Sequence, residues 1–209
     1  MENNKSFEEF DRNFGNPLGC DEAGRGPLAG PVVSACVFFD KEYPLIPFLN
    51  DSKKMTEKSR IKAEEIIRNS TPYIGIAIAE VCQIDKLNIL YASLLAMREA
   101  VYSLKSFDFD MVLVDGNKTI PDFKFKQQAV VKGDAKSFVV ACASVIAKNT
   151  RDRIMKKYDD YFPQYGFSKN KGYPTKEHYR AIEKYGISCI HRKTFNCVKI
   201  RTSGQQSFF

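Results

Sequence analysis

Residues 17–33 read Pro-Leu-Gly-Cys-Asp-Glu-Ala-Gly-Arg-Gly-Pro-Leu-Ala-Gly-Pro-Val-Val, and the rest of the chain is organised around them. An apolar approach ends in two adjacent acids, Asp21 and Glu22, and a turn follows that places one guanidinium between glycines. Neighbouring carboxylates repel each other, so a fold that places both near a strand end needs a cation or a shifted pKa. Glycines let a backbone approach a ligand closely, and arginine recognises phosphate. The alternative interpretation is a solvated acidic turn beside a tight glycine corner.

Composition limits the classes of protein that the chain can belong to. Its 209 residues predict one domain of ordinary size, and a hydrophobic share of 44% is enough for a substantial core. The net charge of +7 favours a polyanionic partner. The acidic N-terminus is not typical of a signal peptide and no apolar run reaches the length of a membrane span, which predicts a cytoplasmic protein without a membrane partner. Scattered single cysteines indicate buried, reduced thiols: Cys20, Cys36, Cys82, Cys142, Cys189 and Cys197.

The hydrophobic pattern predicts a layered α/β or α+β domain with a mixed central sheet flanked by helices. Runs rich in β-branched and aromatic residues predict the strands, which cover 18–21, 32–39, 73–81, 111–114 and 126–131. Thr56 predicts the start of a helix that runs to about residue 69, and Ser137 the start of a long helix to about residue 161. Three-and-four spacing of apolar residues predicts one amphipathic helix over 84–104.

Four segments follow from this reading. Residues 1–16 are a short polar helix or leader, 17–161 the main domain, 162–200 a basic C-terminal extension of short helices and loops, and 201–209 a flexible tail. Cations are dense in the C-terminal third and favour a track of phosphate contacts along a nucleic-acid duplex, with a solvated helix face as the alternative. They are Lys148, Arg151, Arg153, Lys156, Lys157, Lys169, Lys171, Lys176, Arg180, Lys184, Arg192 and Lys193.

Acidic residues recur at the ends of predicted strands. Asp21 and Asp115 each end an apolar strand, and Asp134 follows a third. Strand ends converge on one sheet edge, so these residues and Glu22 form a candidate cluster of oxygen ligands for Mg²⁺ or Mn²⁺. Two such ions would support phosphodiester hydrolysis. Asp134 has an alternative role at the start of the following helix, and for Asp152, between Arg151 and Arg153, an intrahelical ion pair is favoured.

Six blocks of sequence resemble the bacterial ribonuclease HII family, in the order of that family and over about residues 17–195. The blocks are Asp-Glu-Ala-Gly-Arg-Gly-Pro-Leu-Ala-Gly-Pro-Val, Asp51-Ser52-Lys53-Lys54, Val114-Asp115-Gly116, Lys132-Gly133-Asp134-Ala135-Lys136-Ser137, residues 141–152, and Lys171-Gly172-Tyr173-Pro174-Thr175. One departure is Thr194, where the resemblance leads us to expect serine.

The resemblance implies an RNase H-like fold and a metal-dependent endonuclease that cleaves the RNA strand of RNA–DNA hybrids. It further implies incision 5′ of single ribonucleotides in duplex DNA, as in ribonucleotide excision repair, leaving 3′-hydroxyl and 5′-phosphate ends. Matched residue by residue, the acidic site is Asp21, Glu22, Asp115 and Asp134, and the loop that senses the 2′-hydroxyl is Gly24-Arg25-Gly26. Tyr173 matches a tyrosine that stacks near the RNA–DNA junction, with an ordinary loop aromatic as the alternative. Apart from the resemblance, Lys53 and Lys54 are expected to add substrate contacts from the side opposite the basic track.

Other functions remain open at this stage. A non-catalytic RNA–DNA hybrid-binding module would keep the groove but lack one of the four acids, and all four are present. A sugar hydrolase also uses two acids, but this chain has no tryptophan and is basic. The end of the chain, Gln205 to Phe209, resembles a peptide that binds the bacterial sliding clamp; the alternative is a C-terminus folded back on the core. We expect a monomer.

Overall fold

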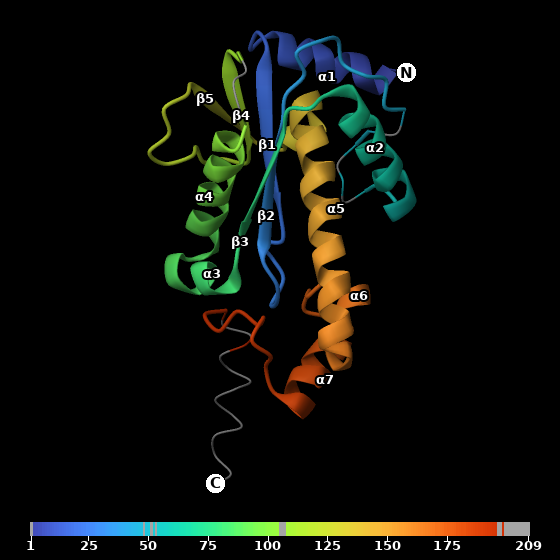
Figure 1. Cartoon of the computed structure of the whole chain (residues 1–209), viewed down its shortest axis with the longest axis vertical. Helices are drawn as coiled ribbons and strands as arrows, with labels where there is room; N and C mark the ends of the chain where they lie inside the picture. Colours follow the sequence, from blue (N-terminus) through green and yellow to red (C-terminus); the bar gives the residue numbers. More distant parts are fainter. Residues whose placement is uncertain are drawn as a thin grey trace.

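A five-stranded mixed sheet forms the middle layer of the molecule, with the strand order β3-β2-β1-β4-β5 (Figure 1). The computed structural model describes residues 2–47, 49, 50, 52, 54–104, 108–195 and 198. β1 pairs antiparallel with β2 and parallel with β4, which confirms the predicted mixed sheet. The strands are β1 (Pro17–Ala23), β2 (Val32–Val37), β3 (Ile74–Ala79), β4 (Met111–Asp115) and β5 (Gln127–Val130).

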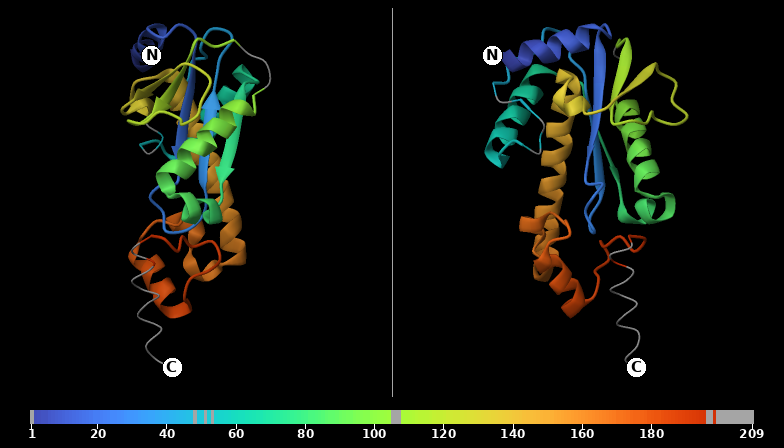
Figure 2. Two further views of the ribbon diagram at one scale, coloured as in Figure 1. Left: turned by 90° about the vertical axis from the view of Figure 1, so that its left-hand side faces the viewer. Right: turned by 180° about the vertical axis from the view of Figure 1, so that it is seen from behind.

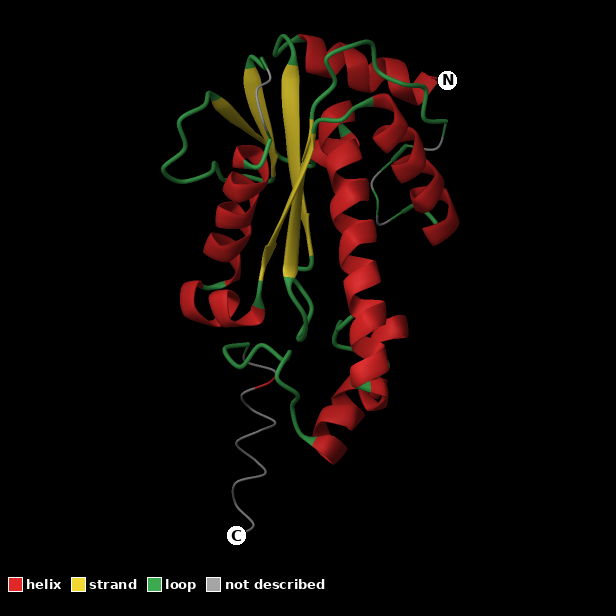
Figure 3. Cartoon of the chain, in the orientation of Figure 1, coloured by secondary structure: helices red, strands yellow, loops and turns green. Residues whose placement is uncertain are grey.

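Helices cover both faces of this sheet, as Figures 2 and 3 show from several sides. One face packs against α5, α2 and α1, and the other against α4. Past the far end of the sheet lie the short C-terminal elements (Figure 1). The helices are α1 (Glu2–Arg12), α2 (Glu57–Ser70), α3 (Val81–Leu87), α4 (Ile89–Tyr102), α5 (Phe138–Tyr161), α6 (Phe167–Asn170) and α7 (Lys176–Tyr185), with single turns η1 (Gly133–Ala135) and η2 (Pro163–Tyr165).

Alternation along β1 decides which side chains face which helix layer. Leu18 and Cys20 join the core beneath α4, so Gly19 and Asp21 point toward α5. A Cβ on Gly19 would lie 2.3 Å from the carbonyl carbon of Val139, so this glycine lets the main chain of β1 touch the first turn of α5. Asp21 is thereby carried into the layer between the sheet and the long helix.

Local capping explains why two of the helices begin where the sequence predicts. Thr56 accepts a hydrogen bond from Ser59 N at 3.1 Å, and Ser137 accepts one from Val140 N at 3.3 Å. Each side chain satisfies a backbone donor that the first turn of a helix leaves unpaired. The predicted starts of α2 and α5 are confirmed.

The prediction of one continuous helix over 84–104 is wrong. The structure has α3 and α4, and Asn88 between them adopts φ 71°. Its side chain accepts a hydrogen bond from Tyr91 N at 3.0 Å and so begins the second helix. Apolar spacing continues across the break because both helices pack on the same layer, so periodicity alone does not reveal the turn.

The C-terminal elements have a small core of their own. Leu28 and Ala29, which follow the β1 strand, pack there with Met155 of α5 and with Tyr165 and Phe167. At the other end of the chain, Phe7 of α1 is buried in the main core. The division at residues 16, 161 and 200 stays a prediction.

The thiols are only partly as predicted. Cys20, Cys36 and Cys142 are buried, but Cys82 and Cys189 are exposed, because α3 and the turn after α7 present them to solvent. Cys197 lies outside the described residues. Within the described ranges, no helix combines the length and the apolar content needed to cross a membrane.

Candidate active site

Asp21 and Asp115 lie next to each other on two parallel strands. The pairing of β1 with β4 aligns Cys20 with Val114, so the two aspartates are the next residue on each strand. β1 continues to Ala23 against β2, two residues further than predicted. Asp21 is 4% exposed, and burial raises its pKa; repulsion from Glu22 and from Asp115 raises it further. Three carboxylates of the candidate set therefore interact here.

Asp134 reaches the same edge through a tight turn. Gly133 N donates a hydrogen bond to Asp115 Oδ1 at 2.7 Å, which ties η1 to the end of β4. Asp134 is the next residue and is buried. Ser137, and not Asp134, is the N-cap of α5, and the alternative that the Asp134 charge stabilises this helix stays open.

Ser144 of α5 is a site residue that the sequence reasoning missed. Its hydroxyl hydrogen-bonds the Asp21 carboxyl and lies 2.7 Å from Ser52 Oγ. The hydrogen bond favours the charged form of Asp21, against the burial that raises its pKa. The available signal was a lone hydroxyl within the otherwise apolar first half of the helix.

A cleft of about 540 Å³ opens beside these acids. It brings the predicted glycine-arginine turn and the predicted stacking tyrosine together with two of the acids. Arg25 Nη1 lies 3.5 Å from Glu22 Oε1, and the Tyr173 ring borders the space above Gly26. Lys53 lies outside the described residues, and its contact stays a prediction. The lining comprises Glu22, Ala23, Gly24, Arg25, Gly26, Ser52, Ile89, Asp115, Lys148, Arg151 and Tyr173.

The donor set fits a hard divalent cation. Among the described residues, the charged donors predicted for this site are carboxylates, and both histidines pack elsewhere, in the C-terminal part. A cation would relieve the repulsion that raises the Asp21 pKa. Across the described residues, no three Asp, Glu, His or Cys side chains already stand as a closed metal-binding group, so the acids adjoin one another without being arranged around an ion.

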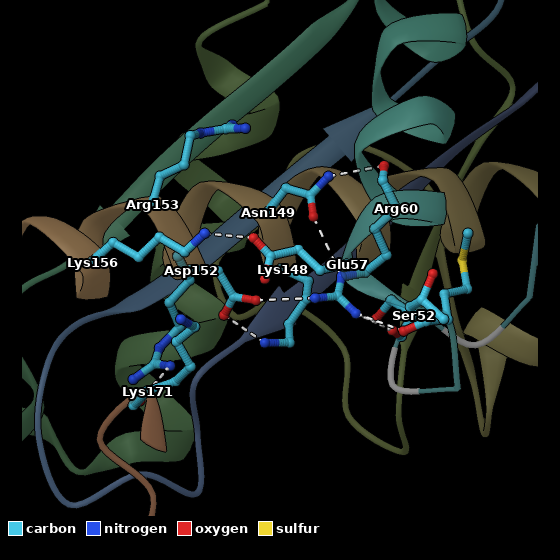
Figure 4. Close-up of polar contacts among 12 residues, drawn as sticks. Ser52, Glu57, Arg60, Lys148, Asn149, Asp152, Arg153, Lys156 and Lys171 are labelled. Carbon is cyan, nitrogen blue, oxygen red and sulfur yellow. Dashed lines mark hydrogen bonds and ion pairs between the residues drawn. The ribbon is translucent and has the colours of Figure 1, made fainter. Parts of the chain in front are cut away.

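Asp152 belongs to a buried ion network rather than to the acidic cluster (Figure 4). Its carboxylate lies 2.5 Å from Lys148 Nζ, one turn earlier on α5, and 3.2 Å from Arg60 Nη2 on α2. The predicted intrahelical ion pair is confirmed, but its partner is Lys148 and not a flanking arginine. Arg153 instead reaches Glu64 at 2.8 Å.

The predicted basic track needs correction at two positions. Arg151 is 1% exposed and Arg192 0%, and both donate to backbone carbonyls. Burial among carbonyls leaves neither guanidinium available to a phosphate. Lys156 is also engaged, at 2.5 Å from Glu57. Lys148 and Arg153 are likewise paired with acids, and a phosphate track along the remaining cations of the set stays a prediction.

Solved structures share this architecture. The ribonuclease H2 from Pyrococcus horikoshii OT3 superposes with a TM-score of 0.74 at 25% identity, covering 92% of this chain and 99% of that one. The RNase HII in the PCNA complex from Archaeoglobus fulgidus gives 0.71 at 24% identity, covering 87% and 96%. The Bst-RNase HIII structure with Mn²⁺ gives 0.70 at 14% identity, covering 93% and 72%. The chain thus has the RNase H-like fold and, with its acids at the sheet edge, is of the ribonuclease H class.

Residues 18–200 match the family model of ribonuclease HII, and the chain belongs to that family. The ribonuclease HII of Caldanaerobacter subterraneus is 47% identical over 197 residues, 93% of this chain and 80% of that protein. That of Clostridioides difficile is 50% identical over 188 residues, 90% and 72% respectively. The chain is therefore an endoribonuclease that degrades the RNA of RNA–DNA hybrids, in a family that uses divalent metal ions.

Proposed function

We propose that this ribonuclease works with two divalent cations, Mg²⁺ or Mn²⁺, held by Asp21, Glu22, Asp115 and Asp134. It incises duplex DNA 5′ of a single ribonucleotide as well as cutting longer hybrids, and leaves 3′-hydroxyl and 5′-phosphate ends. The observation that carries the proposal is the side-by-side placement of Asp21 and Asp115 on parallel strands. Their electrostatic repulsion marks the place where positive charge is needed.

Neighbouring groups hold these acids in place for binding. Ser144 orients Asp21 from α5, and Gly133 N orients Asp115 from the η1 turn. Oriented ligands need less reorganisation when an ion binds. Bound divalent cations supply activation of a water and stabilisation of the leaving oxygen.

Substrate selection falls to the cleft beside the acids. Backbone N–H groups of the Gly24-Arg25-Gly26 turn bond the ribose 2′-hydroxyl, which distinguishes RNA from DNA at a site. Tyr173 is 40% exposed on the same cleft, so its ring is available to stack against the sugar at the junction. Both features support selection of a single ribonucleotide followed by DNA.

Cleavage of duplex DNA that contains one ribonucleotide tests the proposal. With Mg²⁺ or Mn²⁺ we expect one cut, and Asp115→Asn should lower kcat/KM by about 10²–10³-fold because a ligand charge is lost. The matched control is Asp40→Asn, which neutralises an exposed acid outside the cleft and should cut normally. Undiminished cutting by Asp115→Asn refutes the ligand role, and no cutting by the wild type refutes the substrate.

The tail adds a partner to the proposal, the sliding clamp. Residues 205–209 lie outside the described residues, so the support is the sequence itself and the archaeal RNase HII solved in a complex with PCNA. Deleting residues 204–209 should abolish binding to the clamp without changing hydrolysis of a hybrid. Unchanged affinity for the clamp contradicts this part of the proposal.

A further inference from the structure

The buried guanidinium of Arg192 donates hydrogen bonds to carbonyl groups of the turn between β1 and β2. Arg192 lies about 160 residues further along the chain and is 0% exposed. Each of its three nitrogens donates to at least one carbonyl. The acceptors are Gly24 O at 2.6 Å, Arg25 O at 3.0 Å, Pro27 O at 2.7 Å, Gly30 O at 2.8 and 3.0 Å, and Pro31 O at 3.3 Å.

Because the peptide bond is planar, this contact also fixes the direction of the N–H groups in the turn. In a trans peptide the N–H of each residue points opposite to the preceding C=O. The carbonyls of Gly24 and Arg25 point at Arg192, so the N–H groups of Arg25 and Gly26 point the other way. Within the described part of the chain, neither N–H has an intramolecular acceptor. Both residues line the cleft, which Arg192 does not.

The segment that carries Arg192 is fixed on both sides. Asp85 of α3 accepts hydrogen bonds from Lys193 N, Thr194 N and Thr194 Oγ1, at 3.1, 3.0 and 2.6 Å. Threonine thus supplies the hydroxyl that a serine would supply. On the other side, Arg192 N donates to Leu28 O at 2.8 Å. A guanidinium held in this way cannot follow the turn if the turn moves.

We infer that Arg192 is a positioning residue, which holds the Gly24 and Arg25 carbonyls so that the N–H groups of Arg25 and Gly26 face the ribose 2′-hydroxyl. The inference rests on the proposed function, in which this turn reads that hydroxyl. Lysine cannot replace arginine here, because an ammonium has three donors on one atom whereas the guanidinium spreads five over a planar fork. A residue in this role sets discrimination between ribose and deoxyribose, not the chemical step.

The test compares two constants for the active enzyme: KM for duplex DNA with one ribonucleotide, and the inhibition constant Ki of the same duplex made only of DNA. For the wild type the ratio Ki/KM exceeds one. Arg192→Lys should lower this ratio at least about tenfold, equivalent to about 1.4 kcal/mol, chiefly through KM. Met97→Ala, a change at a buried residue of α4, is the control: it should lower the melting temperature and leave the ratio unchanged.

An unchanged ratio in Arg192→Lys overturns the inference, whatever happens to the melting temperature. If Arg192→Lys does not fold, Asp85→Ala is the deciding variant, because it removes the hydrogen bonds that hold the Arg192 segment to α3. This variant should lower the Ki/KM ratio by a smaller factor. An unchanged ratio in Asp85→Ala also overturns the inference. Failure of the proposed function is recognised separately, as a wild type that does not cut or has a ratio of one. Hydrogen exchange at the Arg25 and Gly26 amides then still tests the positioning, since Arg192→Lys should change their rates without any substrate.

Discussion

The two histidines of the chain lie against each other in the C-terminal core. His178 Nε2 and His191 Nε2 are 3.0 Å apart, and both rings are fully buried. Burial lowers the pKa of each, and the neighbouring His178 helps to lower that of His191 to about 4. Ser188 N donates to His191 Nδ1, so that nitrogen carries no proton and His191 is neutral, with its Nε2 donating to His178 Nε2. His178 in turn donates from Nδ1 to Tyr173 O, so it is also neutral.

Acid should therefore weaken this part of the fold. Between pH 6.5 and about 4 the unfolded chain binds protons that the folded pair does not, so the free energy of unfolding falls as the pH falls, by up to roughly 3 kcal/mol. Above pH 6.5 the contribution is complete. We predict that His191→Gln is less stable at pH 7.5 but loses less on going to pH 4.5, as measured by urea unfolding at both pH values.

Asp11 must be separated from this effect. Its buried carboxyl has a pKa raised to about 6, so it contributes stability at low pH that is lost as the pH rises. Asp11 is present in both the wild type and His191→Gln, so its contribution cancels when the pH dependence of the free energy of unfolding is compared between the two proteins. Parallel profiles for the two proteins contradict the prediction.

Residue-level prediction from the sequence worked best where chemistry is visible in the residue type. The pattern predicted that Asp21 and Asp115 lie at neighbouring strand ends, which the structure confirms, while their role as metal ligands stays a prediction. Arg192 could not be identified in this way: its partners are main-chain carbonyls 161 to 168 residues away, which leave no trace in side-chain sequence. Ser144 is intermediate, since a hydroxyl in an apolar helix is visible but its target is not.

At the scale of elements, the turn between α3 and α4 depends on Asn88. Asn88 is the C-cap of α3 and also the N-cap of α4, with φ 71° and ψ 160°. Few residues other than glycine adopt this conformation, and asparagine adds a cap. We predict that Asn88→Ala lowers the free energy of unfolding by about 1 kcal/mol, because it loses the cap without relieving the backbone strain.

Glycine at the same position is the matched control. Asn88→Gly loses the hydrogen bond to Tyr91 N but relieves the backbone, so we expect a cost of only a few tenths of a kcal/mol. Thermal or urea unfolding of both variants is the measurement. An Asn88→Ala protein as stable as the glycine variant would mean that the backbone at this turn relaxes.

Elements were predictable from the sequence where their boundary signal is local. Thr56 and Ser137 each accept a hydrogen bond from a backbone N–H three residues later. The signal for the start of each helix therefore lies within a single turn of sequence. The division of 84–104 depends on a left-handed backbone at Asn88 that an uninterrupted apolar pattern conceals. Similarly, the buried network of Arg60 and Asp152 joins α2 to α5 across 92 residues, and sequence spacing suggested only the pairing within α5.

At the scale of the whole molecule, the net charge of +7 overstates the charge that a duplex can meet. Arg151 and Arg192 donate to buried backbone carbonyls, and Lys156 forms an ion pair with Glu57. The composition counts charges, but only the fold decides which of them face solvent. The mixed sheet and its helical layers were predictable because they follow from the order of elements, whereas this allocation follows from contacts between distant segments.

Arg25 is the cation best placed to report duplex binding. Its side chain is 45% exposed at the cleft, and its ion pair with Glu22 is long at 3.5 Å. We predict that Arg25→Gln makes the slope of log affinity against log salt concentration shallower by about one, because one phosphate contact is lost. The control is Arg12→Gln, which removes the same charge from a side chain 76% exposed on α1 and should keep the wild-type slope. Equal slopes for the two variants would show that Arg25 makes no phosphate contact.

The contact at Gly19 has a consequence for how the enzyme accommodates a bound duplex. No side chain separates β1 from the first turn of α5 there, so no compressible layer lets one element slide over the other. We therefore expect strand and helix to move as one rigid unit that carries the acids at positions 21 and 22. Because Arg192 also holds the carbonyls of Gly24 to Pro31, we expect the acids and the recognition turn to keep their relative positions when a duplex binds.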